Sequence, residues 1–244
     1  MPEGPIIVIL KEAAEQFNGK KIIAAVNDNH KLDTSLFEGQ TVTGFKSHGK
    51  NFFICFKHFN VRIHLMMFGS YTINEHKARK PRLGLQFANG ELNFYTCVVE
   101  MIEGPLDELY DWHADVMNQK WSSAKAVEKL QDKPKALACD VLLDQHIFAG
   151  AGNIIKNEVL FRTKIHPKSL IGSIPTRKLK EMVDEVATYS FEFLKWKKEF
   201  TLKKHWKAYG QKICPRNKVP FHKADLGKTH RGCYYCDLCQ VLYA

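Results

Sequence analysis

Residues 145–153, Gln-His-Ile-Phe-Ala-Gly-Ala-Gly-Asn, place two glycines immediately ahead of a helical segment. Backbone N–H groups at the start of a helix bind phosphate well, and the side chain of Asn153 could add another donor. A tight turn between two helices would use the same residues equally well. The stretch therefore predicts a helix–turn–helix unit whose turn, at Gly152 and Asn153, suits a phosphate.

Helical patterns surround this turn. Residues 122–131 begin with serines that suit a helix N-cap, and residues 135–145 carry a short apolar face. A further helix follows from Asn153, and residues 176–200 form a long amphipathic pattern. We expect a helical domain over 113–204.

The sequence before this domain has a different character. Residues 5–17 predict a helix with a proline at its start. From 20 to 104, short β-branched and aromatic runs alternate with turn residues, and Asn89-Gly90 is a hairpin signal. We therefore expect an N-terminal domain over 1–112, an antiparallel β-sandwich with an N-terminal helix.

The composition narrows the class of protein. The chain has 244 residues, a net charge of +10 and an isoelectric point near 9.2. A basic surface suits a polyanion, most commonly nucleic acid, or an acidic membrane surface. We expect no membrane span and no signal peptide. Seven cysteines without a secretory signal favour a reduced, intracellular setting such as the bacterial cytoplasm.

The chain starts with MPEGP at residues 1–5. Removal of Met1 would expose the secondary amine of Pro2, and α-amino groups titrate near ~8, well below a lysine. Such an amine can attack a sugar carbon and form an iminium, while Glu3 can move protons. The alternative is that these residues have no catalytic role and simply favour the start of a helix.

A small cysteine-containing finger is expected over 205–244. Cys236 and Cys239 form a C-x-x-C pair, and Cys214 starts a second pair whose other position is Asn217, a poor zinc ligand. Three cysteines are well placed for one structural Zn²⁺, and a finger that folds without metal is the alternative. The candidates for the fourth ligand are His222, His230 and Cys233.

Two basic residues occupy turns that could reach a phosphate. Lys50 follows a glycine in a turn that enters an apolar strand and could reach a phosphate or a reactive centre, which makes it a candidate catalytic residue, although a solvated turn lysine is the commoner case. Arg231 lies where a β-hairpin of the finger would present its forked guanidinium.

Three bulky apolar residues in succession precede Gly69. They cannot all face one side of a strand, so some should be exposed at a loop tip. Exposed apolar wedges unstack DNA and fill the gap left by a flipped base; a fully buried strand is the alternative. The residues are Met66, Met67 and Phe68.

Taken in order, these segments resemble the formamidopyrimidine-DNA glycosylase and endonuclease VIII family from end to end. The resemblance implies an α+β fold of two domains, an N-terminal β-sandwich and a C-terminal helix–two-turn–helix domain ending in a zinc-finger-like β-hairpin. It implies that Pro2 attacks C1′ of a damaged nucleotide and that Glu3 is the acid/base. It implies phosphate contacts for Lys50, Asn153 and Arg231. The wedge would be Met66, Met67 and Phe68.

The family branch follows from two features. The MPEGP start looks like the endonuclease VIII branch, and the connection at 195–212 is shorter than the loop with which the purine-specific branch caps its base. Two positions depart from the family: Ile6 stands where a glutamate is usual, and Asn217 where a zinc cysteine is usual.

We therefore expect a bifunctional glycosylase and abasic-site lyase acting on damaged DNA. Oxidised pyrimidines are the expected lesions, with β-elimination and δ-elimination cutting the strand. We expect a monomer that needs no organic cofactor. The alternatives are a glycosylase for 8-oxoguanine or formamidopyrimidine and a non-catalytic protein that binds lesions.

Overall fold

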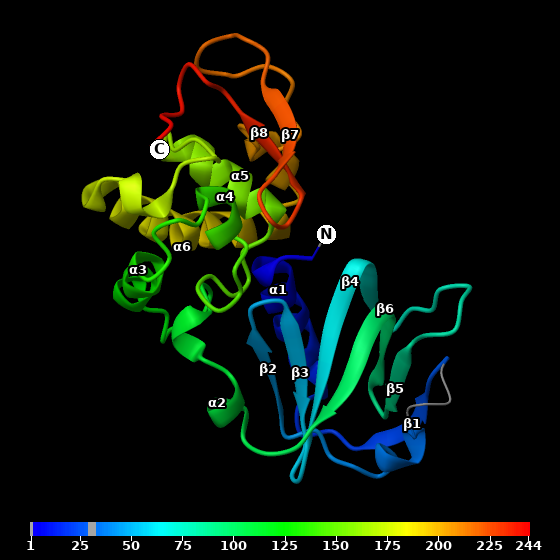
Figure 1. Cartoon of the computed structure of the whole chain (residues 1–244). Coiled ribbons are helices and arrows are strands. Elements are labelled where there is room, and N and C mark those ends of the chain that lie inside the picture. The colour runs from blue at the N-terminus through cyan, green and yellow to red at the C-terminus, as the bar shows by residue number, and fades with distance from the viewer. Residues whose placement is uncertain (1, 29–32) are drawn as a thin grey trace. The chain divides into compact units, whose positions relative to one another are not determined.

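The computed structural model describes residues 2–28 and 33–244 and divides them into two compact units, Met1–Tyr110 and Asp111–Ala244. Met1, on whose removal the proposed amine depends, lies outside the described residues. Figure 1 labels the elements of each unit. The first unit is a β-sandwich with an N-terminal helix, and the second is helical and ends in a β-hairpin, which confirms the expected α+β fold.

The first unit begins with helix α1 (Gly4–Ala14), continued by a 3-10 turn at Glu15–Phe17, as expected from Pro5. Six antiparallel strands follow in the order β1-β5-β6-β4-β3-β2. The strands are β1 (Ile22–Val26), β2 (Gly44–His48), β3 (Asn51–Cys55), β4 (Asn60–Ile73), β5 (Leu83–Phe87) and β6 (Gly90–Ile102).

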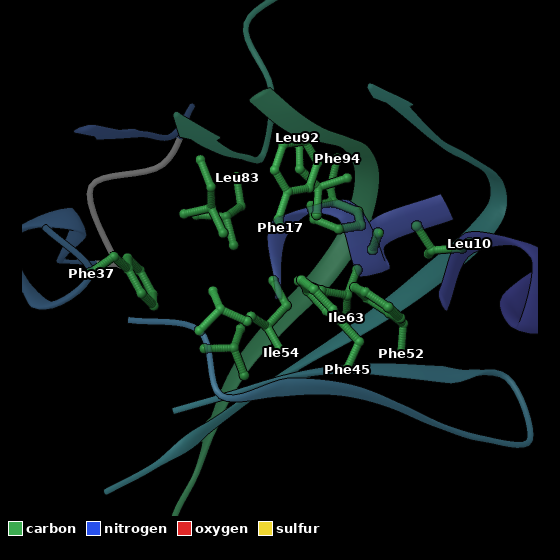
Figure 2. Packing of buried hydrophobic residues seen from close by; sticks show 14 of the residues in the cluster. Leu10, Phe17, Phe37, Phe45, Phe52, Ile54, Ile63, Leu83, Leu92 and Phe94 are labelled. Atoms are coloured by element: carbon green, nitrogen blue, oxygen red, sulfur yellow. The ribbon is translucent and has the colours of Figure 1, made fainter. Parts of the chain in front are cut away.

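One hydrophobic core holds this unit together. Apolar side chains from every strand and from α1 meet in it, as Figure 2 shows for ten labelled residues. Phe17 after α1 stacks on Phe87 of β5 at a ring distance of 4.5 Å, and Phe52 of β3 lies 5.8 Å from Phe94 of β6. Buried aromatic pairs of this kind stabilise a fold beyond their buried area, so the helix is fixed against the sheet.

The hairpin predicted at Asn89-Gly90 is present but turns one residue earlier. Phe87 pairs with Gly90, so Ala88 and Asn89 form the turn and Gly90 starts β6. Gly90 has φ 141°, and a Cβ there would lie 2.0 Å from Oδ1 of Asn74. The glycine is therefore needed for its close contact with Asn74 beside the turn.

The second unit contains four further helices and three short 3-10 turns before the finger hairpin. Ser122 caps α3 by accepting a hydrogen bond from the Lys125 N–H at 3.3 Å, as its sequence predicts. The helix expected at 135–145 is only one turn long. The helices are α3 (Ser123–Gln131), α4 (Ala138–Val141), α5 (Asn153–Arg162) and α6 (Thr176–Lys198), and the short α2 (Leu106–Leu109) precedes the unit.

The finger hairpin consists of β7 (His222–Leu226) and β8 (Arg231–Tyr235). Leu226 pairs with Arg231 across the turn. After β8 the chain returns to the helical unit, where the His166 N–H donates to the Val241 carbonyl at 2.9 Å. No helix in the described part of the chain is long and apolar enough to span a membrane.

Candidate functional site

Pro2 and Glu3 lie immediately before α1 and are both buried. The Glu3 carbonyl accepts hydrogen bonds from the N–H groups of Ile6 and Ile7 at 2.9 and 3.4 Å, which fixes the residue to the first helical turn. Its side chain is 0% exposed. The fold thus holds a carboxylate next to the proposed nucleophile, and burial strengthens its interaction with any nearby charge.

Lys50 lies in the two-residue turn between β2 and β3, where Gly49 has φ 56°. Behind it, Nδ1 of His64 lies 3.0 Å from Oδ1 of Asn51. Burial lowers the pKa of His64, and the charges of Arg62 and Lys50 lower it further. These effects favour the neutral imidazole, and the cations beside it are Lys50 and Arg62, which is paired with Glu100. Sequence reasoning did not single out His64 or Asn51.

The wedge residues are exposed, but within β4 rather than at a loop tip. Leu65 pairs with Cys97 and Ser70 pairs with Tyr95, so four residues of β4 oppose the single Thr96 of β6. Such a β-bulge re-aims side chains away from a sheet. The exposed fractions at the bulge are 46% for Met66, 49% for Met67 and 81% for Phe68.

Gly69 makes this bulge possible. A Cβ on Gly69 would lie 2.7 Å from the Met66 nitrogen, 2.8 Å from the Thr96 oxygen and 2.9 Å from the Leu65 Cα. All three are backbone atoms, which cannot move aside cheaply. The glycine that follows the three apolar residues is therefore a packing requirement of the bulge.

The glycine turn leads directly into α5, with Gly152 as its N-cap. The Gln145 side chain braces the turn: its Oε1 accepts from the Gly150 N–H at 3.1 Å and its Nε2 donates to the Ala151 carbonyl at 3.0 Å. Asn153 is 9% exposed, and its Nδ2 donates to the Gly232 carbonyl at 3.1 Å. The turn and the finger strand β8 therefore meet at Asn153.

Two further residues of α5 hold the finger, and the sequence did not reveal them. Asn157 donates from Nδ2 to the Gly232 carbonyl at 3.1 Å and accepts from the Tyr234 N–H at 2.8 Å. Nζ of Lys156, a residue 1% exposed, lies 3.2 Å from both the Gly232 carbonyl and Sγ of Cys233. With Asn153, they give the first part of α5 three side chains that contact β8.

Cys233 faces this helix and not the other finger cysteines. A hydrogen bond from Cys139 and the amino group of Lys156 lower the pKa of Cys233 to about 6, against the opposing effect of burial. The same hydrogen bond and burial raise the pKa of Cys139. A buried charge needs a partner, and the Cys233 thiolate supplies one for Lys156.

Arg231 is exposed at the first position of β8, as the hairpin prediction required. The turn before it is fixed to α4, because the Asp140 carboxylate accepts from the N–H groups of Lys228 and Thr229 at 3.1 and 3.4 Å. A Cβ on Gly227 would lie 2.2 Å from Oδ1 of Asp140. Arg231 thus follows a turn whose backbone has little freedom to move.

Cys214, Cys236 and Cys239 come together as the sequence predicts. Their sulfur atoms lie within 4.8 Å of one another, and this donor set suits a soft divalent metal. Glu158 of α5 fixes the chain that leads to them, because its fully buried carboxylate accepts from the N–H groups of residues 207–209 at 2.8–3.0 Å.

None of the three predicted substitutes for the fourth ligand belongs to this cluster. Cys233 contacts Lys156, as described above. His222 pairs through Nε2 with Oδ2 of Asp237 at 3.1 Å, and His230 is exposed in the finger turn.

The two units thus carry separate parts of the predicted site. Pro2, Glu3, Lys50 and the wedge belong to the first unit. The turn at Gly152 and Asn153, the exposed Arg231 and the three cysteines belong to the second.

Comparison with known proteins gives this arrangement a family. Residues 1–98 match the model of the formamidopyrimidine-DNA glycosylase N-terminal domain, and residues 114–199 match that of the formamidopyrimidine-DNA glycosylase H2TH domain. The chain belongs to the formamidopyrimidine-DNA glycosylase and endonuclease VIII family. The helix–two-turn–helix segment named in the second match contains the glycine turn and α5, which confirms the resemblance seen in the sequence.

Relatives of this family member carry endonuclease VIII names. Endonuclease 8-like 3 of Mus musculus is 29% identical over 84% of this chain, and endonuclease 8-like 2 of Bos taurus is 33% identical over 71%. The chain covers 35% of the mouse protein and 56% of the bovine one, so both relatives are considerably longer.

Solved structures share the fold of the chain. A viral DNA glycosylase has a TM-score of 0.86 at 17% identity, covering 98% of this chain and 100% of its own. The Lactococcus lactis formamidopyrimidine DNA glycosylase, bound non-covalently to DNA containing an abasic site, has a TM-score of 0.85 at 22% identity and covers 98% and 99%.

Proposed function

We propose that this chain is a base-excision-repair DNA glycosylase with an abasic-site lyase activity, whose nucleophile is the amine of Pro2. The observation that carries the proposal is the position of Pro2 and buried Glu3 at the start of α1, inside the segment that matches the glycosylase N-terminal domain. The proposal requires that Met1 be removed, because only then does the Pro2 nitrogen have a lone pair for attack.

The proposed reaction uses Pro2 as the nucleophile and Glu3 as the acid/base. The Pro2 nitrogen attacks C1′ of the damaged nucleotide, the bond to the base breaks and the base leaves with a proton. The resulting iminium acidifies C2′, and loss of that proton expels the 3′ phosphate by β-elimination. A second elimination expels the 5′ phosphate. Glu3 is the proposed acid/base for ring opening and these transfers.

DNA is the proposed partner, held through its phosphates. Lys50 of the first unit and Arg231 of the second each present a charged donor from a short turn. The turn at Gly152 and Asn153, which leads into α5, is the proposed phosphate site of the second unit, because helix N-termini suit phosphate. The net charge of +10 favours such binding, which should weaken steeply with salt.

The bulge of β4 is the proposed wedge. Extrusion of a damaged nucleotide costs a few kcal/mol and leaves a gap in the duplex. Met66, Met67 and Phe68 present apolar surface that can fill this gap, supported by the rigid backbone at Gly69.

Oxidised pyrimidines such as thymine glycol are the proposed substrates. The connection between α6 and the finger is compact, with residues 207–209 bound to the Glu158 carboxylate, and it leaves no long loop to cap a purine. A purine-type glycosylase acting on 8-oxoguanine or formamidopyrimidine is the alternative among enzymes.

A structural Zn²⁺ is proposed for the finger. The three thiols of Cys214, Cys236 and Cys239 fit the metal because they converge at one point and because thiolates bind zinc strongly. When bound, the ion would cross-link the two ends of the finger, and it takes no part in the proposed reaction.

Borohydride trapping on duplexes with defined lesions tests the activity. The wild-type protein, with Met1 removal verified by intact mass, should give a covalent enzyme–DNA adduct and nick thymine glycol and abasic duplexes. Pro2→Gly should strongly reduce the adduct, while Pro105→Ala, an exposed proline of the same unit, should not. Tight binding to abasic DNA without any adduct would instead support a non-catalytic lesion-binding protein.

A further inference from the structure

The finger contains an oxygen atom at the place where a fourth zinc ligand belongs. Oδ1 of Asn217 lies 3.8 Å from Sγ of Cys214 and 3.7 Å from Sγ of Cys236. Sγ of Cys214 lies 3.8 Å from Sγ of Cys239. The side chain of Asn217 therefore faces the same point as the three sulfur atoms, although asparagine replaces a cysteine at this position.

These distances match those between ligands of one tetrahedral metal. With metal–sulfur bonds of about 2.3 Å, two sulfur ligands are about 3.8 Å apart. With a metal–oxygen bond of about 2.1 Å, an oxygen and a sulfur ligand are about 3.6 Å apart. The sulfur–sulfur distance and both sulfur–oxygen distances around Asn217 agree with these values to within 0.2 Å.

The charge around the cluster fits a neutral fourth ligand. Three thiolates and one Zn²⁺ carry a net charge of −1, and a fourth cysteine would make it −2. Nη1 of Arg216 lies 3.7 Å from Sγ of Cys239 and donates to the Phe161 carbonyl at 2.7 Å. One fixed guanidinium thus balances the charge of a site built from three thiolates and an amide.

We propose that Asn217 binds the metal through Oδ1, so that the finger holds Zn²⁺ with three cysteines and one asparagine. This inference rests on the zinc site proposed above. A neutral amide oxygen is a weaker donor to zinc than a thiolate, so the metal should exchange faster than it would from a four-cysteine finger.

Four forms of the 244-residue chain test the assignment: wild type, Asn217→Ala, Asn217→Asp and Asn217→Cys. Each is loaded with Co²⁺, whose sulfur-to-metal charge-transfer absorption counts thiolates, and with Zn²⁺, whose release to a chelator is timed. Wild type should bind one equivalent with the absorption of three thiolates, and Asn217→Cys should show that of four. Asn217→Ala should release Zn²⁺ about tenfold faster or more, since even outer-shell changes have effects of this size.

Asn217→Asp separates a direct ligand from a supporting one. If Oδ1 binds the metal, a carboxylate replaces it and Zn²⁺ release slows. If instead the Asn217 NH₂ group supports the thiolates by hydrogen bonds, aspartate cannot donate and release quickens, which overturns the proposal. The matched control is His222→Ala, the rejected ligand candidate, and it should leave the spectrum and the release rate unchanged.

Failure of the zinc site and failure of Asn217 as its ligand give different results. Wild-type protein with well below one equivalent of metal would refute the zinc site itself and with it the role of Asn217. Full occupancy with equal release rates for wild type and Asn217→Ala would keep the zinc site and refute only Asn217 as its ligand.

Discussion

Nδ2 of Asn153 donates a hydrogen bond to the Gly232 carbonyl at 3.1 Å, across 79 residues of sequence. Asn153 opens α5 after the glycine turn, and Gly232 directly follows Arg231 in the finger. The two segments for which we propose phosphate contacts are therefore joined directly by this hydrogen bond. A change that loosens this joint should affect DNA binding without touching either contact.

Asn157→Ala tests the joint. Asn157 is 1% exposed and bonds both the Gly232 carbonyl and the Tyr234 N–H. Its removal takes the acceptor from the Tyr234 N–H and one of three donors from the Gly232 carbonyl, so we expect the free energy of unfolding to fall by about 1–3 kcal/mol. Denaturant unfolding measures the change. Asn18→Ala, an exposed asparagine, is the control, and an equal loss in both variants would contradict the prediction.

Cys233→Ser should alter the pH dependence of stability. The pKa of Cys233 is lowered from 9.0 to about 6 in the folded protein, so its thiolate stabilises the fold fully above pH 9. That stabilisation is lost as pH falls from 9 to about 6, with a slope of up to about 1.4 kcal/mol per pH unit. The difference in unfolding free energy between wild type and variant should shrink over this range. A difference independent of pH would show that Cys233 is a thiol in the folded state.

Gly69→Ala should damage the bulge of β4. The added Cβ would meet backbone atoms at 2.7–2.9 Å, so the strand must shift, at a cost of about 1–3 kcal/mol in the free energy of unfolding. Gly44→Ala is a matched control, because a Cβ there meets nothing within 4 Å. Similar unfolding curves for the two variants would mean that the bulge adjusts freely.

Phe68→Ala should slow lesion processing while leaving stability unchanged, because the side chain is 81% exposed. Loss of the wedge raises the cost of extrusion, and each ~1.4 kcal/mol slows the reaction tenfold. Single-turnover nicking of a lesion duplex, with 2-aminopurine opposite the lesion, measures both steps. Phe191→Ala removes an exposed phenylalanine from α6 and is the control. Unchanged extrusion in Phe68→Ala would exclude this residue from the wedge.

Arg231→Ala should lower the salt sensitivity of DNA binding. Removal of one phosphate contact reduces the slope of log affinity against log salt by about one. Titrations at several salt concentrations measure this slope, with Arg177→Ala, an exposed arginine at the start of α6, as control. The unfolding curve of the variant should match wild type. If both variants keep the wild-type slope, Arg231 does not contact phosphate.

Local patterns in the sequence determined most of the fold. Pro5 indicated the start of α1, Ser122 the cap of α3, and the two glycines before Asn153 the turn into α5. These signals work because caps, turns and periodic faces depend on neighbours a few residues away. The three clustered cysteines were predictable for the same reason, since C-x-x-C spacing brings two ligands together locally.

Only the tertiary structure decided how the finger is held and which side chain faces its three clustered cysteines. Cys233 lies three residues before Cys236, yet its thiol faces Lys156, a partner 77 positions away. Asn217, by residue type a poor zinc ligand, has a side-chain oxygen that faces Cys214 and Cys236. Residue spacing fixes which groups are near along the chain, but the packing of β8 on α5 fixes which way they face.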